Sequence, residues 1–81
     1  MFFICKRTSD INFKFVINCK EKSKVLFKSK LLNNSEIEMF AYDNIADYIY
    51  QKNLKIFFLR GKLRENMRVE IIEIYNFKFL D

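Results

Sequence analysis

Three basic side chains recur at every second position of residues 57–64, which read FFLRGKLR: Arg60, Lys62 and Arg64. Successive side chains of a β-strand point to opposite faces, so this spacing places the three on one strand face together with Phe58. Cationic side chains bind phosphate oxygens, and aromatic rings stack on nucleobases. The stretch therefore has the composition of a surface that binds a single-stranded nucleic acid.

The same side chains also have a structural interpretation. Exposed ion pairs with Glu38, Glu70 or Glu73 on neighbouring strands would neutralise the three cations, each contributing less than about 1 kcal/mol. Phe58 would equally suit a protein interface, where phenylalanine is enriched. Both interpretations stay open for each of these residues.

A second group of basic residues occupies positions 14–30, where six lysines face a single acidic residue, Glu21. In the alternating stretch KVLFKSKLL, Lys28 and Lys30 lie on the face opposite the apolar residues Val25 and Phe27. We expect Lys28 and Lys30 to contact phosphates together with the basic face of residues 60–64. A basic stripe indicates nucleic acid, an anionic membrane or an acidic partner. Solubility of a small phenylalanine-rich chain is the alternative explanation.

The residue inventory argues against catalysis and metal binding. The chain has no histidine, the commonest general base, so no Ser–His or Cys–His pair exists. Cys5 and Cys19 match no metal or redox spacing, and we expect both to be reduced, in or near a core. We therefore expect a protein that is not an enzyme and has no cofactor and no metal. No apolar run approaches the roughly 20 residues of a transmembrane helix, so no transmembrane segment is predicted.

The 81 residues predict one domain, residues 1–81, that is mainly β. Strands are expected over 24–32 and 36–42, joined at Asn33–Asn34, and over 54–65 and 67–80. Residues 2–20 read as one bent strand or two short ones. A helix is expected over 43–53, with Asp43 or Asn44 as its N-cap. This order predicts an OB-fold, a five-stranded barrel with one short helix between strands 3 and 4.

Gly61 is the only glycine, and it falls inside the expected strand 54–65. Glycine weakens a strand interior, so its presence suggests a corner where the barrel strand bends against its neighbours. With this geometry Arg60, Lys62 and Arg64 project outward, while Leu59 and Leu63 turn toward the core.

The chain from Glu36 onward resembles a known family. The stretches EIEMFAYDNIADYI and LKIFFLRGKLRENMRVEII are similar to bacterial single-stranded-DNA-binding proteins and their PriB-like primosomal relatives. In that family a strand with an aromatic near its end leads into a helix, and a strand of the type V-x-I-E-G-x-L-R follows. The resemblance covers a little over half of the chain. It implies an OB-fold, sequence-tolerant binding of single-stranded DNA or RNA, and homo-oligomers.

The resemblance aligns Tyr42 with a stacking aromatic and Gly61 with the family's glycine. From the sequence alone, Tyr42 can equally be a hairpin-edge aromatic that covers the start of the helix.

Departures from the family support a second hypothesis. The chain stops at FKFLD without a long acidic-tipped tail, it has no tryptophan, and Glu36 stands where one stacking tryptophan aligns. The alternative function is an OB-fold subunit that docks on a larger plastid complex (photosynthetic, transcription or translation) and has lost nucleic-acid binding.

Ile, Lys, Asn and Phe make up almost half of the chain, and their codons are rich in A and T. We therefore expect a plastid protein, with the bacterial cytoplasm as the alternative location.

Overall fold

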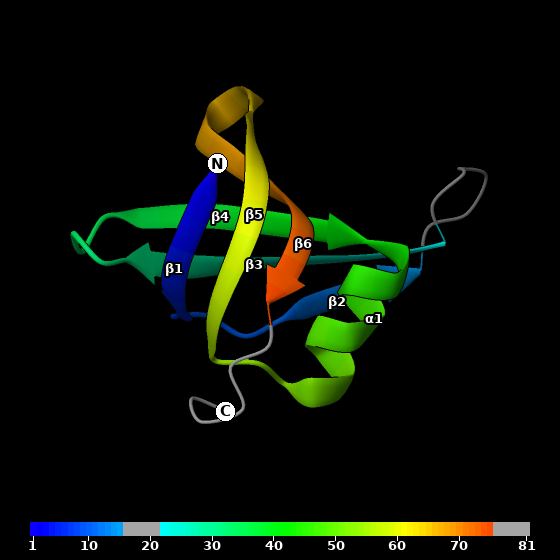
Figure 1. Ribbon diagram of the computed structural model, residues 1–81. Coiled ribbons are helices and arrows are strands. Elements are labelled where there is room, and N and C mark those ends of the chain that lie inside the picture. The colour runs from blue at the N-terminus through cyan, green and yellow to red at the C-terminus, as the bar shows by residue number, and fades with distance from the viewer. Residues whose placement is uncertain (16–21, 76–81) are drawn as a thin grey trace.

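The structure is a computed structural model that describes residues 1–15 and 22–75. Within these residues, six strands, one α-helix and one 3-10 turn follow each other (Figure 1). In chain order they are β1 (Phe2–Arg7), β2 (Asn12–Phe15), β3 (Ser23–Leu31), β4 (Glu36–Tyr42), α1 (Asp43–Lys52), β5 (Ile56–Arg64), η1 (Glu65–Met67) and β6 (Arg68–Tyr75).

Five of the six strands close a barrel. Their order is β1-β5-β6-β4-β3, and β1 returns to β3 by antiparallel pairing of Cys5 with Leu31 and of Arg7 with Ser29. The pair β4–β6 is parallel, whereas the other pairs are antiparallel. The expected OB-like barrel is thus confirmed, with the helix between β4 and β5.

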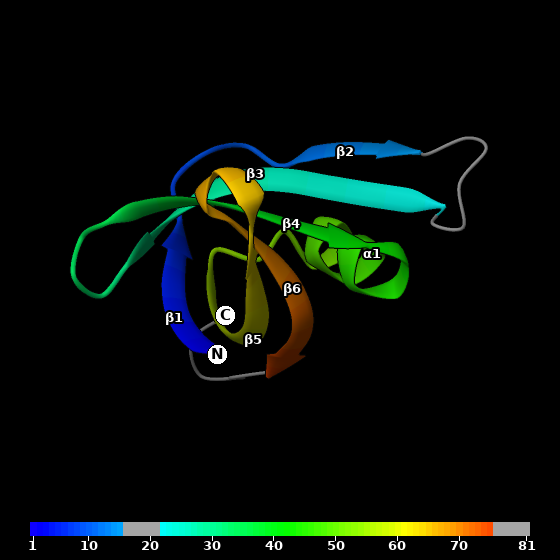
Figure 2. The ribbon, with the colours of Figure 1, turned by 90° about the horizontal axis from the view of Figure 1, so that it is seen from above.

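The N-terminal strand is divided into two pieces, of which β1 belongs to the barrel and β2 extends the sheet beside β3 (Figure 2). At the break, the Thr8 N–H donates to the Lys28 carbonyl at 2.8 Å, and the Lys28 N–H donates to Ser9 Oγ at 2.8 Å. When β1 and β2 are counted as one strand, the helix lies between strands 3 and 4 as expected. The rest of the expected N-terminal strand, including Cys19, lies outside the described residues, as does the expected strand beyond Tyr75.

The core follows the alternation of the strands. Val25 and Phe27 of β3 point inward, and Phe57 and Leu59 do so from β5. The rings of Phe27 and Phe57 meet edge to face at 5.5 Å. Cys5 joins this core as a free thiol, and burial raises its pKa to about 11. The expectation of a buried reduced cysteine is confirmed for Cys5.

Helix α1 covers one end of the barrel with its buried Ala46 and Ile49 (Figure 1). Its expected N-cap is wrong, because Tyr42 occupies that position and no side chain caps the helix. The Asp43 carboxylate instead bonds to the segment before β3: its Oδ1 accepts a hydrogen bond from the backbone N–H of Lys22 at 2.6 Å. The helix ends at Asn53, which adopts the left-handed conformation.

Gly61 of β5 lies in close contact with β6. A Cβ at this position would lie 2.6 Å from Val69 Cγ1 and 2.9 Å from the Glu70 carbonyl oxygen. The register steps from Arg60–Glu73 to Gly61–Ile71, so Ile72 is an extra residue that forms a β-bulge. The expected crowded corner at Gly61 agrees with this geometry. The expected inward position of Leu63 is wrong: at the barrel rim this side chain is 50% exposed.

None of the helices in the described parts of the chain is long and apolar enough to span a membrane.

Candidate nucleic-acid interface

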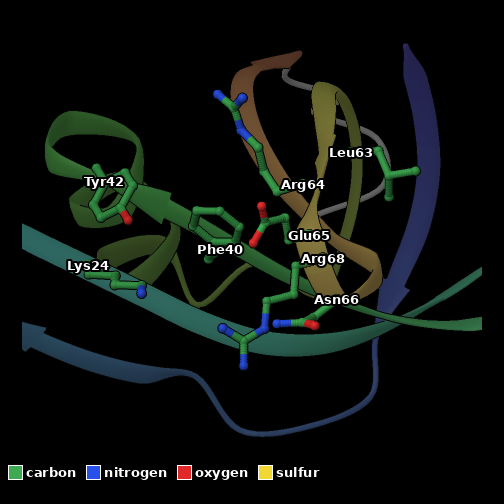
Figure 3. A pocket seen from close by; sticks show the side chains of 8 residues that line it. All are labelled: Lys24, Phe40, Tyr42, Leu63, Arg64, Glu65, Asn66 and Arg68. Atoms are coloured by element: carbon green, nitrogen blue, oxygen red, sulfur yellow. The ribbon is translucent and has the colours of Figure 1, made fainter.

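An open groove of about 600 Å³ lies between the outer surface of β3–β4 and the turn that joins β5 to β6. Figure 3 shows the Phe40 ring near its centre, with Tyr42 and Lys24 on one side and the turn residues on the other. Eight residues line it: Lys24, Phe40, Tyr42, Leu63, Arg64, Glu65, Asn66 and Arg68.

The floor of the groove is aromatic because β4 alternates. Met39 and Ala41 are buried, so Phe40 and Tyr42 point outward from the same strand, and their rings meet edge to face at 5.7 Å. Lys24 Nζ lies 5.3 Å from the Phe40 ring centroid and 5.6 Å from that of Tyr42. An ammonium group is thus held above two aromatic faces, the geometry of a cation–π contact.

The opposite wall is formed by the turn after β5. Asn66 and Met67 both have positive φ, which folds the chain sharply between β5 and β6. This turn presents Arg64 and Arg68, and each binds a carboxylate: Arg64 Nη2 lies 2.7 Å from Glu70 Oε1, and Arg68 binds Glu38. Both arginines of this wall are therefore ion-paired.

The charges of the groove nearly cancel. Lys24, Arg64 and Arg68 are balanced by Glu65 on the wall and by the two glutamates that bind the arginines. Lys24 is the cation of the groove that forms no ion pair within the described chain. The unbalanced positive charge lies beside the groove, on the exposed lysines of β2 and β3.

The structure separates the residues that the sequence grouped. Tyr42 and Arg64 line the groove. Lys28 and Lys30 continue the outer face of β3 beyond it. They do not face Arg60, because β1 lies between β3 and β5 on one side, and β4 and β6 lie between them on the other. Lys62 is exposed and lies opposite Glu70 in the β5–β6 register.

Phe58 and Arg60 belong to a different surface. Phe2, Phe58 and Tyr75, here called the outer aromatic cluster, lie on the outside of β1, β5 and β6 with ring centroids 5.1–6.0 Å apart. Arg60 lies beside them and forms an ion pair of 3.8 Å with Glu73. A hydrogen bond with Glu73 raises the pKa of Tyr75. The ion pairs expected as the structural alternative thus form for Arg60 and Arg64.

Six of the eight residues that line the groove were not predicted as site residues, among them Lys24, Phe40 and Arg68. Lys24 and Phe40 share the alternation that marks Lys28 and Tyr42, and this signal was available. Arg68 had no such signal, because its place depends on the turn and on parallel pairing of Glu38 with Arg68.

Among residues 1–15 and 22–75, no group of three potential ligands (His, Cys, Asp or Glu) is placed to hold a metal ion. In comparisons with known proteins, no family model, no curated protein and no solved structure matches the chain.

Proposed function

We propose that the protein binds single-stranded nucleic acid, DNA or RNA, in the groove between β3–β4 and the β5–β6 turn, without catalysis. The observation that carries this proposal is the outward pair Phe40 and Tyr42 with Lys24 held above both rings. Single-strand-binding proteins combine aromatic stacking platforms with a cationic track for the backbone. The groove offers both within one surface.

The place of the groove in the fold supports the proposal by analogy. OB-folds bind oligonucleotides on the face of their second and third strands, beside the loop between the fourth and fifth. Here β3 and β4 are those strands, and residues 65–67 are that loop. The resemblance to single-stranded-DNA-binding proteins, with Tyr42 in the place of a stacking aromatic, is in agreement.

The two kinds of contact are divided between two parts of the surface. The groove is nearly neutral and partly aromatic, so it suits bases, whereas phosphates suit the lysines that border it on β2 and β3. Arg64 and Arg68 keep N–H donors beyond those used by their glutamates, because a guanidinium carries five. These donors are available for the base edges.

Fluorescence anisotropy with labelled oligothymidylate, and with a duplex of equal length, tests this function across a salt series. We expect the single strand to bind more tightly, with affinity falling as salt rises by about 0.7 log units per log unit of salt for each phosphate contacted. Failure to bind any single strand at low salt would refute the proposal.

The outer aromatic cluster favours a second candidate function, a subunit that docks on a larger assembly. Phe2 is 61% exposed and Ile4 beside it is 42% exposed, so large apolar side chains meet solvent on this face. Such patches mark protein interaction sites. Purification of the native protein distinguishes the two functions: one stoichiometric protein complex that survives nuclease treatment supports docking, whereas loss of all partners on nuclease treatment supports nucleic-acid binding.

A further inference from the structure

Lysine stands opposite lysine at two places in the sheet. Lys6 of β1 is the register partner of Lys30 of β3, and Lys14 of β2 is the partner of Lys24 of β3. All four point away from the core: Lys6 and Lys14 are exposed, and Lys24 and Lys30 alternate with buried residues of β3. Like charges directly opposite each other destabilise a sheet. Each pair therefore costs stability in the protein without a ligand.

None of these lysines forms an ion pair with a carboxylate of the described residues. The ion pairs among the described residues all use arginine. Glu36 lies in register with Lys30, and Glu38 with Lys28, yet neither forms an ion pair with its lysine in the described chain. Glu38 binds Arg68 instead. Among the described residues, no ion pair on the neighbouring strand thus offsets the repulsion.

Lys24 has the geometry expected of a repelled group. Its register partner Lys14 lies on β2, on one side of β3, whereas its ammonium group lies over the rings of Phe40 and Tyr42 on the other side. Because the Lys24 side chain extends in this direction, its charge lies in the groove. Lys24 therefore connects the lysine pairs with the aromatic floor.

We propose that Lys6, Lys14, Lys24 and Lys30 form a phosphate track along β3, and that the backbone of a bound nucleic-acid strand relieves their repulsion. This inference rests on the proposed function and extends it from the groove to β1. Lys24 and Lys30 are six residues apart in β3, which corresponds to about 20 Å of strand, and Lys28 lies between them. A repeating polyanion fits a track of this length, and its continuity with the groove through Lys24 favours nucleic acid. Binding and fold stability are coupled through the same lysines.

A double-mutant cycle in the ligand-free protein tests the repulsion. At low salt, Lys6→Gln and Lys30→Gln are each expected to raise the melting temperature by about 1–6 °C. The double variant should gain little more than either single one, because removing one lysine already relieves the pair. Lys55→Gln is the matched control: this exposed lysine has no lysine as a register partner in the described sheet, so its removal should not raise the melting temperature. The inference would be overturned if either single variant had a lower melting temperature than the wild type, or if the two increases added in the double variant.

Binding of oligothymidylate to the same variants tests whether these lysines contact the phosphates of a nucleic acid. Lys6→Gln and Lys30→Gln should each lower the slope of log affinity against log salt by about 0.7, whereas Lys55→Gln, in a separate hollow, should leave it unchanged. If the lysine variants bind tightly and keep the wild-type slope of log affinity against log salt, the phosphate track is refuted, whereas the proposed binding in the groove still stands. Absence of binding in every form would refute the proposed function, and the track with it. Binding to anionic lipid vesicles but not to oligothymidylate would assign the lysines to a membrane surface and likewise overturn the inference.

Discussion

Gly61 of β5 lies so close to Val69 of β6 that no side chain fits between them. The space for a Cβ is occupied by Val69 Cγ1 at 2.6 Å and by the Glu70 carbonyl oxygen at 2.9 Å. The N–H of Gly61 also donates to the Met1 carbonyl at 2.9 Å. One glycine thus allows β5 to pack on β6 and pair with the start of the chain, next to the bulge at Ile72.

Gly61→Ala should lower the free energy of unfolding by about 1–3 kcal/mol, because the added methyl group overpacks this contact. Urea denaturation followed by circular dichroism measures the loss. Combining it with Val69→Ala should recover part of the loss, since one of the two obstructing atoms is removed while the Glu70 carbonyl remains. Fully additive losses in the double variant would show that Val69 is not the obstruction.

Phe40→Ala should weaken binding of oligothymidylate by about 5- to 150-fold, corresponding to one stacked base. Phe2→Ala is the matched control, because Phe2 is a more exposed aromatic in the outer aromatic cluster, outside the groove. Anisotropy titrations give both affinities, and circular dichroism checks that the variants are folded. A larger loss in Phe2→Ala than in Phe40→Ala would move the binding site to the outer aromatic cluster.

Lys24→Gln should reduce the dependence of affinity on salt, lowering the slope of log affinity against log salt by about 0.7. The reason is that its ammonium group lies at the groove and has no carboxylate partner in the described chain. Lys55→Gln is the control, since Lys55 lines a separate hollow beside Arg7 and Asn53. Equal slopes in the wild type and Lys24→Gln would contradict the phosphate contact.

Cys5 should make the protein less stable at alkaline pH. Burial raises the pKa of this thiol from 9.0 to about 11, so between these values the unfolded chain loses a proton that the folded chain keeps. Stability from this group is complete below pH 9 and falls as the pH rises toward 11, by about 2–3 kcal/mol in total. Denaturation of the wild type and of Cys5→Ala between these pH values isolates the effect. Parallel curves for the two proteins would contradict it.

The alternation in the sequence was sufficient to predict the described strands and, except at Leu63, the side of each strand that faces the core. The helix was predicted as well, from its own apolar spacing. Strand neighbours were not predictable to the same degree, since they depend on how the barrel closes. Lys28 and Arg60 therefore appeared to share a surface, although β1, or β4 with β6, lies between their strands. In VEIIEIY the spacing of Glu70 and Glu73 carries a signal of the bulge, because two consecutive isoleucines interrupt the alternation.

The groove itself could not be predicted from the sequence, for a physical reason. Its second wall depends on a turn in which Asn66 and Met67 adopt positive φ, and the sequence ENM has no glycine to mark it. Tyr42 was identified through its place in the strand and through the resemblance. Arg68 enters only because the parallel pair β4–β6 places it beside Glu38.

Chemical-shift mapping by NMR tests the central claim most directly, and a chain of 9.9 kDa is well suited to it. Titration of the labelled protein with oligothymidylate at low salt should shift the amide signals of Lys24, Phe40, Tyr42 and Arg68, and leave those of Phe2 and Phe58 in place. Shifts centred on Phe2 and Phe58 with none around Phe40, or no shifts at all, would contradict the account.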